Sequence, residues 1–204
     1  MPPDAPSLDF WFEFASTYSY PAAMRLAPLA QRAGVAVRWR PFLLGPIFQA
    51  QGWDNSPFNI YPAKGRYMWR DLERLCARER LDFRRPRQFP QSGLIAARVA
   101  LVAFDEGWGE EFSRAAYRAQ FAEDRLIGDP AVIRELILEL KREPKPVFDR
   151  IQGDEIKARL RAQTQEAQHL GIFGAPSFVT ADGELFWGND RLEQALDWTR
   201  AQQT

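Results

Sequence analysis

Strand-like patterning lies only at the two ends of this chain, and this is the feature that most constrains its fold. Between positions 8 and 14 the residues alternate with the period of two that a β-strand requires, with Leu8, Phe10, Phe12 and Phe14 against Asp9, Trp11 and Glu13. Helical spacing follows over 20–33 and ends at Gly34, and a second strand pattern covers 35–42. This order predicts a βαβ unit whose strands run parallel with a right-handed crossover.

The strand signal returns near the other end of the chain. It covers 177–180 and 185–187, on either side of a turn at 181–183, and a last helix is expected over 190–202. Each half of the pattern alone would leave unpaired strand edges. We therefore predict that the βαβ half and the ββα half form one sheet.

The middle of the chain shows helical patterns and none that predicts a strand. The expected helices span 67–80, 94–105, 110–121, 130–141 and 154–168. Asp129-Pro130 is typical of an N-cap followed by proline at the first helical position, and Pro144-Lys145-Pro146 is interpreted as a separator between two helices. The predicted fold class is α/β, with a sheet domain over 1–44 and 170–204 interrupted by an all-helical insertion domain over 45–169.

The charge balance excludes several kinds of partner. The 204 residues include 27 Lys+Arg and 27 Asp+Glu, so the composition offers no electrostatic footprint for nucleic acid or for a membrane surface. The first six residues lack the basic region and apolar run of a signal peptide, and no later stretch is apolar for long enough to span a bilayer. We therefore expect a cytoplasmic protein that binds neither nucleic acid nor membranes.

A single cysteine and a single histidine limit the chemistry further. With only Cys76 and His169, the chain cannot form an intramolecular disulfide, and a Cys/His zinc site is nearly ruled out, so no metal is expected. A Cys–His nucleophile pair would require these two residues to meet. Cys76 is in step with Met68 and Leu72 on one helical face, which favours a core position.

The loop after the first strand is the candidate site. In a βαβ unit this loop leads to the N-terminus of the helix, where free backbone N–H groups and the helix dipole favour an anion. Thioredoxin-like enzymes place Cys-x-x-Cys there, and the helix end makes the attacking cysteine acidic. At the same spacing this chain has Ser16-Thr17-Tyr18-Ser19. Either the site is inactive or a ligand supplies the thiol, and Ser16 could also be a simple helix cap.

Several segments, taken together and in order, resemble one known family. They are Phe12-Glu13-Phe14-Ala15-Ser16-Thr17-Tyr18-Ser19-Tyr20, Pro41-Phe42-Leu43-Leu44-Gly45, Pro62-Ala63-Lys64-Gly65-Arg66-Tyr67, Gly174-Ala175-Pro176 and Phe186-Trp187-Gly188-Asn189-Asp190-Arg191-Leu192. The chain resembles, over nearly its whole length, the 2-hydroxychromene-2-carboxylate isomerases and their relatives, the kappa-class glutathione transferases. The resemblance implies a thioredoxin-like fold, glutathione as cofactor, a small aromatic carboxylate as substrate and a homodimer.

The resemblance also assigns roles near the centre of the site. Ser16 matches the family serine that hydrogen-bonds the glutathione sulfur, where it would orient and stabilise a thiolate instead of attacking as a nucleophile. Ala175 would pair its backbone with the cysteinyl part of the tripeptide, beside Pro176. Thioredoxin folds carry a cis-proline at this place, although a bare Ala-Pro before a strand is weak evidence by itself.

Other matched residues would hold the two ends of glutathione. The resemblance implies that Asn55 and Lys64 reach the glycine end. Asn189, Asp190 and Arg191 would hold the γ-glutamyl end, where Asp190 suits the ammonium and where Asn189 and the helix N-terminus suit the carboxylate. Without the family pattern, Asn55 would be interpreted as a turn residue, Lys64 as a solvated lysine and the Asn-Asp pair as a helix cap.

The chain departs from the family pattern at three places. Family members often have proline where Thr17 stands, leucine where Pro21 stands and asparagine after the Phe-Pro seen at Phe89-Pro90, where this chain has Gln91. The last departure could alter the pocket for the second substrate. Aromatic residues that could line that pocket are Trp11, Phe48, Trp53, Phe58 and Phe89.

The expected activity is glutathione-dependent cis–trans isomerisation by reversible thiolate addition, in the degradation of aromatic compounds. Two alternatives stay open at this point. One is a transferase or peroxidase that consumes glutathione. The other is a non-catalytic thioredoxin-like binding module whose serines record a lost redox function.

Overall fold

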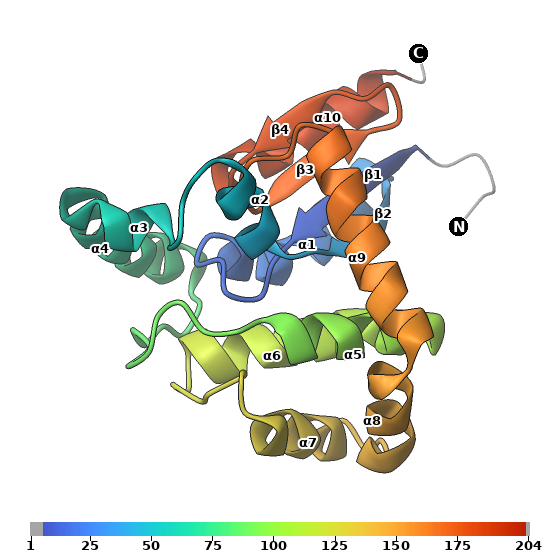
Figure 1. The fold of residues 1–204 in the computed structure, drawn as a ribbon. Coiled ribbons are helices and arrows are strands. Elements are labelled where there is room, and N and C mark those ends of the chain that lie inside the picture. Colours follow the sequence, from blue (N-terminus) through green and yellow to red (C-terminus); the bar gives the residue numbers. More distant parts are fainter. Residues whose placement is uncertain (1–5, 203–204) are drawn as a thin grey trace.

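The sheet joins the two ends of the chain, as the patterning predicts. The computed structural model describes residues 6–202; the first five residues, on which the expectation about a signal peptide depends, and residues 203–204 lie outside this range. The strand order is β2-β1-β3-β4, with β1–β2 parallel and the other pairs antiparallel (Figure 1). The strands are β1 (Ser7–Phe12), β2 (Ala36–Pro41), β3 (Ser177–Thr180) and β4 (Leu185–Trp187). The α/β fold class with a helical insertion is therefore confirmed.

Helices make up the rest of the regular structure between residues 6 and 202. Those from α2 to α9 all lie between β2 and β3 in sequence. The helices are α1 (Ser19–Ala33), α2 (Leu44–Ala50), α3 (Pro57–Ile60), α4 (Pro62–Glu79), α5 (Leu94–Asp105), α6 (Gly109–Phe121), α7 (Pro130–Glu139), α8 (Pro144–Gln152), α9 (Asp154–His169) and α10 (Leu192–Ala201), with a 3₁₀ turn η1 (Asn189–Arg191) before α10. None of the helices that the structure describes is long and apolar enough to cross a membrane.

Strand β1 divides the core into two parts because its side chains alternate between the two faces of the sheet. Phe10 lies opposite Trp39 of β2 and Phe178 of β3, and the three rings pack with centroids 4.9 Å and 5.4 Å from that of Phe10. This face belongs to the large core cluster that continues into the helical insertion. Trp11 points to the other face, where a smaller cluster includes Ala167 of α9. The alternation expected for β1 is confirmed.

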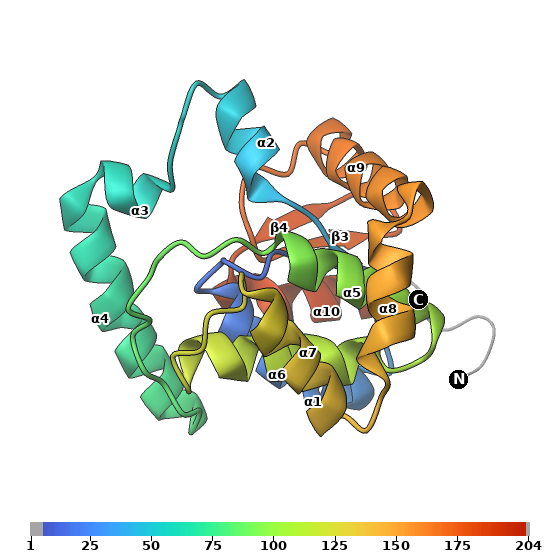
Figure 2. The ribbon, with the colours of Figure 1, turned by 60° about the horizontal axis from the view of Figure 1, so that its bottom comes forward.

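The helices form layers around the sheet, with one pair standing apart. Helices α1 and α10 contact each other and the strands, whereas α9 and α2 cover the Trp11 face. Helices α5 and α6 pack together and link the sheet to α7 and α8. In both Figure 1 and Figure 2, α3 and α4 stand on the side of the molecule opposite α8 and α9. We call α3 and α4 the α3–α4 arm.

The interpretation of Pro144-Lys145-Pro146 as a separator is wrong, because these residues begin α8. Proline is tolerated in the first turn of a helix, where its missing N–H would have no partner inside the helix. The short helices α2 and α3 were not expected either, since neither has enough turns to produce a periodic pattern. The αL conformation of Gly34 (φ 67°) at the end of α1 and the N-cap by Asp129 are confirmed.

Replacing Phe10 by alanine should lower the free energy of unfolding by about 3 to 5 kcal/mol, because a fully buried ring is removed from the centre of the sheet. Leu138→Ala, at a side chain that is 55% exposed on α7, is the control and should change stability little. Denaturant unfolding measures both. A Phe10→Ala variant as stable as the parent would contradict this view of the core.

Candidate active site

A large cavity opens where β1 ends. Its volume is about 1140 Å³, and its walls come from the loop after β1, the segment from α2 to α4, the 89–94 segment and the loop before β3. Segments far apart in sequence therefore meet there. Ser16, Asn55, Lys64 and Ala175, four of the residues assigned by resemblance, line this cavity.

Ser16 lies just before α1 and faces the loop before β3. Its Oγ donates a hydrogen bond of 2.8 Å to the carbonyl oxygen of Ala175, and its backbone N–H donates one of 3.0 Å to the carbonyl of Glu13. The N-cap position of α1 is Tyr18, whose side chain makes no capping bond. Ser16 is therefore not the helix cap. Its hydroxyl stands near a helix N-terminus, where the free N–H groups favour an anion.

The Ala175–Pro176 peptide bond is cis, which agrees with the cis-proline that thioredoxin folds carry at this place. Ala175 is half-buried and lines the cavity, whereas Pro176 is buried and does not line it. The carbonyl of Pro176 accepts a 2.9 Å bond from the N–H of Gly188, which ties this turn to the end of β4. Ala175 therefore lines the cavity beside a turn that is tied to the end of β4, and its carbonyl is bonded to Ser16.

Asn55 and Lys64 lie on the other wall. Asn55 is exposed, and its Oδ1 accepts bonds from the N–H of Ser56 (2.7 Å) and the amide of Asn59 (3.0 Å), so it does stabilise a turn. Lys64 is exposed on the first turn of α4, with Nζ 5.0 Å from the centre of the Tyr61 ring. Among the residues lining this cavity, Lys64 is the only basic side chain.

A second cavity of about 610 Å³ contains the remaining assigned residues, Asn189, Asp190 and Arg191. The Asn189 side chain is buried and its Oδ1 accepts a 3.1 Å bond from Arg25, which also forms an ion pair with Glu79. Because Oδ1 is bonded to Arg25, the Nδ2 amide of Asn189 is the side-chain group that could bind a ligand. Asp190 and Arg191 are exposed, and Oδ2 of Asp190 lies 3.8 Å from Nη2 of Arg191.

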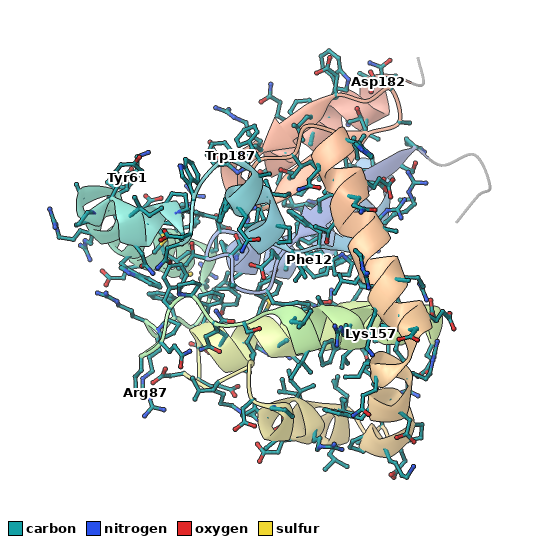
Figure 3. The ribbon with its side chains drawn as sticks, in the orientation of Figure 1. Phe12, Tyr61, Arg87, Lys157, Asp182 and Trp187 are labelled. Carbon is teal, nitrogen blue, oxygen red and sulfur yellow. The ribbon has the colours of Figure 1, made fainter. Side chains whose placement is uncertain are left out.

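Tyr18 and Trp187 line both cavities, so the two adjoin. Trp187 lies at the edge of the sheet that faces the α3–α4 arm, which carries Tyr61 (Figure 3). A Cβ added at Gly174 would lie 2.4 Å from the indole nitrogen of Trp187, so only glycine allows this packing. We call the two adjoining cavities together the groove. Lys64 and Ser16 line its first cavity, and the 189–191 turn lines its second.

Sequence reasoning missed the α4 wall of the second cavity. Tyr18 donates a 3.0 Å hydrogen bond to Asp71, which also bonds to Arg74 at 3.0 Å, and Arg78 lies one turn further along. Burial and the Asp71 carboxylate raise the pKa of Tyr18 above its usual range, so the phenol stays neutral. Helical spacing would have placed these α4 residues on one face, but nothing in the sequence shows that this face meets the 189–191 turn.

Most of the aromatic residues expected in the pocket line the first cavity. They are Phe48, Trp53, Phe58 and Phe89. Trp11 does not, because it points to the α9 face of the sheet and packs against Phe42. Gln91, at the position where the family often has asparagine, also lines the first cavity. Its Nε2 donates to the carbonyl of Arg125 (3.3 Å), and its Oε1 accepts from the N–H of Ile127 (2.8 Å).

Glu13 is a further residue of the site that sequence reasoning did not single out. It is buried, lines the first cavity and has no ion pair with any residue between 6 and 202. Burial raises its pKa to about 8, although a hydrogen bond from the Ala15 backbone acts in the opposite direction. The carboxyl is therefore mostly uncharged at neutral pH.

The single cysteine and the single histidine take no part in the groove. Cys76 is buried in the core, and burial raises the pKa of its thiol to about 12, which confirms the prediction of a core residue. His169 is exposed at the end of α9. Neither residue lines either of the two cavities. Chemistry in the groove that needs a thiol must therefore take it from a ligand.

The fold and the groove define a thioredoxin-like protein with serine at the position of the redox cysteine. Residues 7–198 match the model of the DSBA-like thioredoxin domain, and the chain belongs to that family. It is 32% identical over 199 residues to a 2-hydroxychromene-2-carboxylate isomerase of Sphingobium xenophagum, covering 92% of this chain and 94% of that one. Within the larger family, the chain therefore belongs with these isomerases and their kappa-class relatives.

Two further comparisons agree with this placement. Glutathione S-transferase kappa 1 of Caenorhabditis elegans is 26% identical over 208 residues, covering 96% of this chain and 91% of that protein. A solved 2-hydroxychromene-2-carboxylate isomerase superposes with a TM-score of 0.84 at 23% identity, covering 97% of each chain. Both relatives are enzymes by name, and the fold similarity extends over the whole described chain.

The raised pKa of Glu13 should make the stability of the protein depend on pH. Between pH 4.5 and about 8 the folded carboxyl keeps a proton that the unfolded chain releases, so stability falls as pH rises through that range, by at most about 1.4 kcal/mol per pH unit. The Glu13→Gln variant should lack this pH-dependent loss of stability, so its free energy of unfolding should rise relative to that of the parent as pH increases. Denaturant unfolding at several pH values measures the difference. Parallel pH profiles for the two proteins would contradict the assignment.

Proposed function

We propose that this protein is a glutathione-dependent cis–trans isomerase acting on 2-hydroxychromene-2-carboxylate or a related intermediate of aromatic degradation. The observation that carries the proposal is the juxtaposition of Ser16, the N-terminus of α1 and the Ala175 backbone in a groove whose lining residues include no thiol. The relationship to the isomerases supports the reaction type. A cytoplasmic location and a homodimer are part of the same proposal.

The charged residues of the groove suit the charged ends of glutathione. The tripeptide has a carboxylate at its glycine end and both an ammonium and a carboxylate at its γ-glutamyl end. Lys64 lines the first cavity, whereas Asp190, Arg191 and Arg74 bring both signs of charge to the second. Ser16 lines the first cavity, and the Ala175 backbone to which it bonds is suited to a peptide.

Bound glutathione would supply a thiolate, which adds reversibly to an enone carbon and leaves again after the carbon chain has rotated. Ser16 would stabilise the charged sulfur together with the N-terminus of α1. The Ser16 hydroxyl now donates to the Ala175 carbonyl, so a ligand N–H that takes this carbonyl would free the hydroxyl for the sulfur. The aromatic residues of the first cavity would exclude water and hold a flat substrate.

A glutathione transferase is the second candidate, and the relationship to the kappa-class enzyme favours it. The same groove would bind the same cofactor in both cases. The difference lies in the fate of the thiol, which a transferase consumes and an isomerase returns.

Replacing Ser16 by alanine should leave the fold intact and reduce kcat much more than glutathione affinity. One hydrogen bond to a charged sulfur is worth about 1.5 to 3 kcal/mol, so a loss of roughly tenfold or more is expected. Ser7→Ala, which changes a serine of β1 outside both cavities, is the control. Steady-state kinetics measures kcat, and calorimetry measures glutathione affinity. Equal kinetics for Ser16→Ala and the parent would contradict the role proposed for Ser16.

Replacing Asp190 by asparagine should weaken glutathione binding by about tenfold, because a charge-assisted bond to the γ-glutamyl ammonium becomes neutral. Asp197→Asn, at an exposed carboxylate of α10, is the matched control and should bind like the parent. Isothermal calorimetry gives both affinities. Unchanged binding by Asp190→Asn would refute the placement of the γ-glutamyl end.

The stoichiometry of the thiol separates isomerase from transferase. If glutathione acts as a catalyst, a trace amount should support many turnovers of a hydroxychromene carboxylate, with the free thiol unchanged at the end. Substrate absorbance and thiol titre, followed together under limiting glutathione, provide the measurement. Product formation that stops after one equivalent of thiol has been lost would establish the transferase instead.

A further inference from the structure

Glu13 is a buried carboxyl placed beside the chemistry of the groove. It follows β1 directly and stands three residues before Ser16. Figure 3 labels its neighbour Phe12, which lies near the centre of the molecule where the strand ends. The backbone carbonyl of Glu13 accepts two 3.0 Å bonds, from the N–H of Ser16 and from the hydroxyl of Tyr117. The position of Glu13 is thus fixed relative to Ser16.

The side chain of Glu13 is held in a fitted space. A Cβ added at Gly93, at the start of α5, would lie 2.5 Å from Oε1 of Glu13, so the carboxyl fills the space that the missing side chain leaves. Glu13 also lines the first cavity, although only 6% of the residue is exposed. One of its carboxyl oxygens is thus packed against Gly93 and the residue reaches the same cavity wall as Ser16.

The charges around Glu13 are few. From α6, Tyr117 faces it, and burial raises the pKa of Tyr117 well above its usual value, so that phenol is neutral. The other ionisable residues lining the cavity are Asp54, Lys64, Tyr18 and Tyr67, from the α2–α3 segment, α4 and the loop before α1. None of them forms an ion pair with Glu13 within residues 6–202. Within residues 6–202, no positively charged side chain pairs with the Glu13 carboxyl, so an ion pair does not explain why an acidic residue is found at this position.

A purely structural role does not require an acid here. A buried carboxyl without a cationic partner lowers stability, and a glutamine of the same shape could fill the Gly93 space and accept the Ala15 hydrogen bond without an ionisable group. What distinguishes glutamate from glutamine is a proton that can leave and return. The cavity is the place to which that proton could go.

We propose that the Glu13 carboxyl is the proton carrier of this site, donating its proton to the substrate oxygen that becomes negatively charged and taking it back as the product forms. This role depends on the proposed isomerase reaction. When sulfur adds to the enone carbon, a carbon–sulfur bond forms and the electrons of the double bond move to the carbonyl oxygen. That oxygen takes the proton of Glu13. After rotation the carboxylate recovers the proton, the double bond re-forms and the carbon–sulfur bond breaks, so nothing is gained or lost overall.

The first test compares the parent with Glu13→Gln in turnover. Loss of a general acid should lower kcat by about 100-fold or more, with glutathione affinity unchanged. In the parent, kcat should fall as pH rises through about 8, where the acid form is lost, whereas the variant should lack this limb. Asp9→Asn is the control, since Asp9 is a buried carboxylate of β1 that is paired with Arg38 and lines neither cavity.

The second test requires no turnover. Infrared difference spectroscopy between the parent and Glu13→Gln should show a protonated carboxyl at neutral pH that titrates away through about pH 8. An ionised carboxylate at neutral pH, or equal kcat and equal pH profiles for both proteins, would overturn the proton-carrier role. Absence of turnover by the parent would instead remove the proposed isomerase and this role with it, whatever the infrared result.

Discussion

The pairing of β1 with β3 is the interaction on which the rest of the structure depends. It places Phe10 opposite Phe178 and thereby joins two halves of a sheet that the whole helical insertion separates in sequence. The same pairing brings the loop after β1 beside the loop before β3, so Ser16 can bond to Ala175 across 159 positions of the chain. The aromatic packing that stabilises the sheet therefore also assembles the site.

The sequence predicts the sheet well because its signals are local. Alternation along β1 follows from having one face against the large core and one against α9, and Gly34 and Asp129 mark helix ends through their own backbone chemistry. Pro144 was misjudged because proline both ends and begins helices, and only the neighbouring turn decides which. The domain boundaries at 45 and 169 stay a prediction.

The site is predictable only in part, for a physical reason. Ser16 and Ala175 could be singled out because the βαβ order and the proline motif fix where they lie on the fold. Tyr18, Asp71 and Trp187 could not, since their shared wall results from how α4 stands against the 189–191 turn, and no local pattern carries that information. Glu13 looked like one more alternating strand residue, and only its burial beside Gly93 distinguishes it.

The insertion also shapes the groove from a distance. Gln91 is buried and anchors the 89–94 segment to the backbone of Arg125 and Ile127, between α6 and α7. That anchor fixes Phe89 at the cavity wall and sets Gly93 against the Glu13 carboxyl, so one amide side chain positions both an aromatic surface and the space around an acid. Gln91 stands where the family resemblance implies asparagine, and it lines the first cavity while its amide supports the wall through these two backbone bonds.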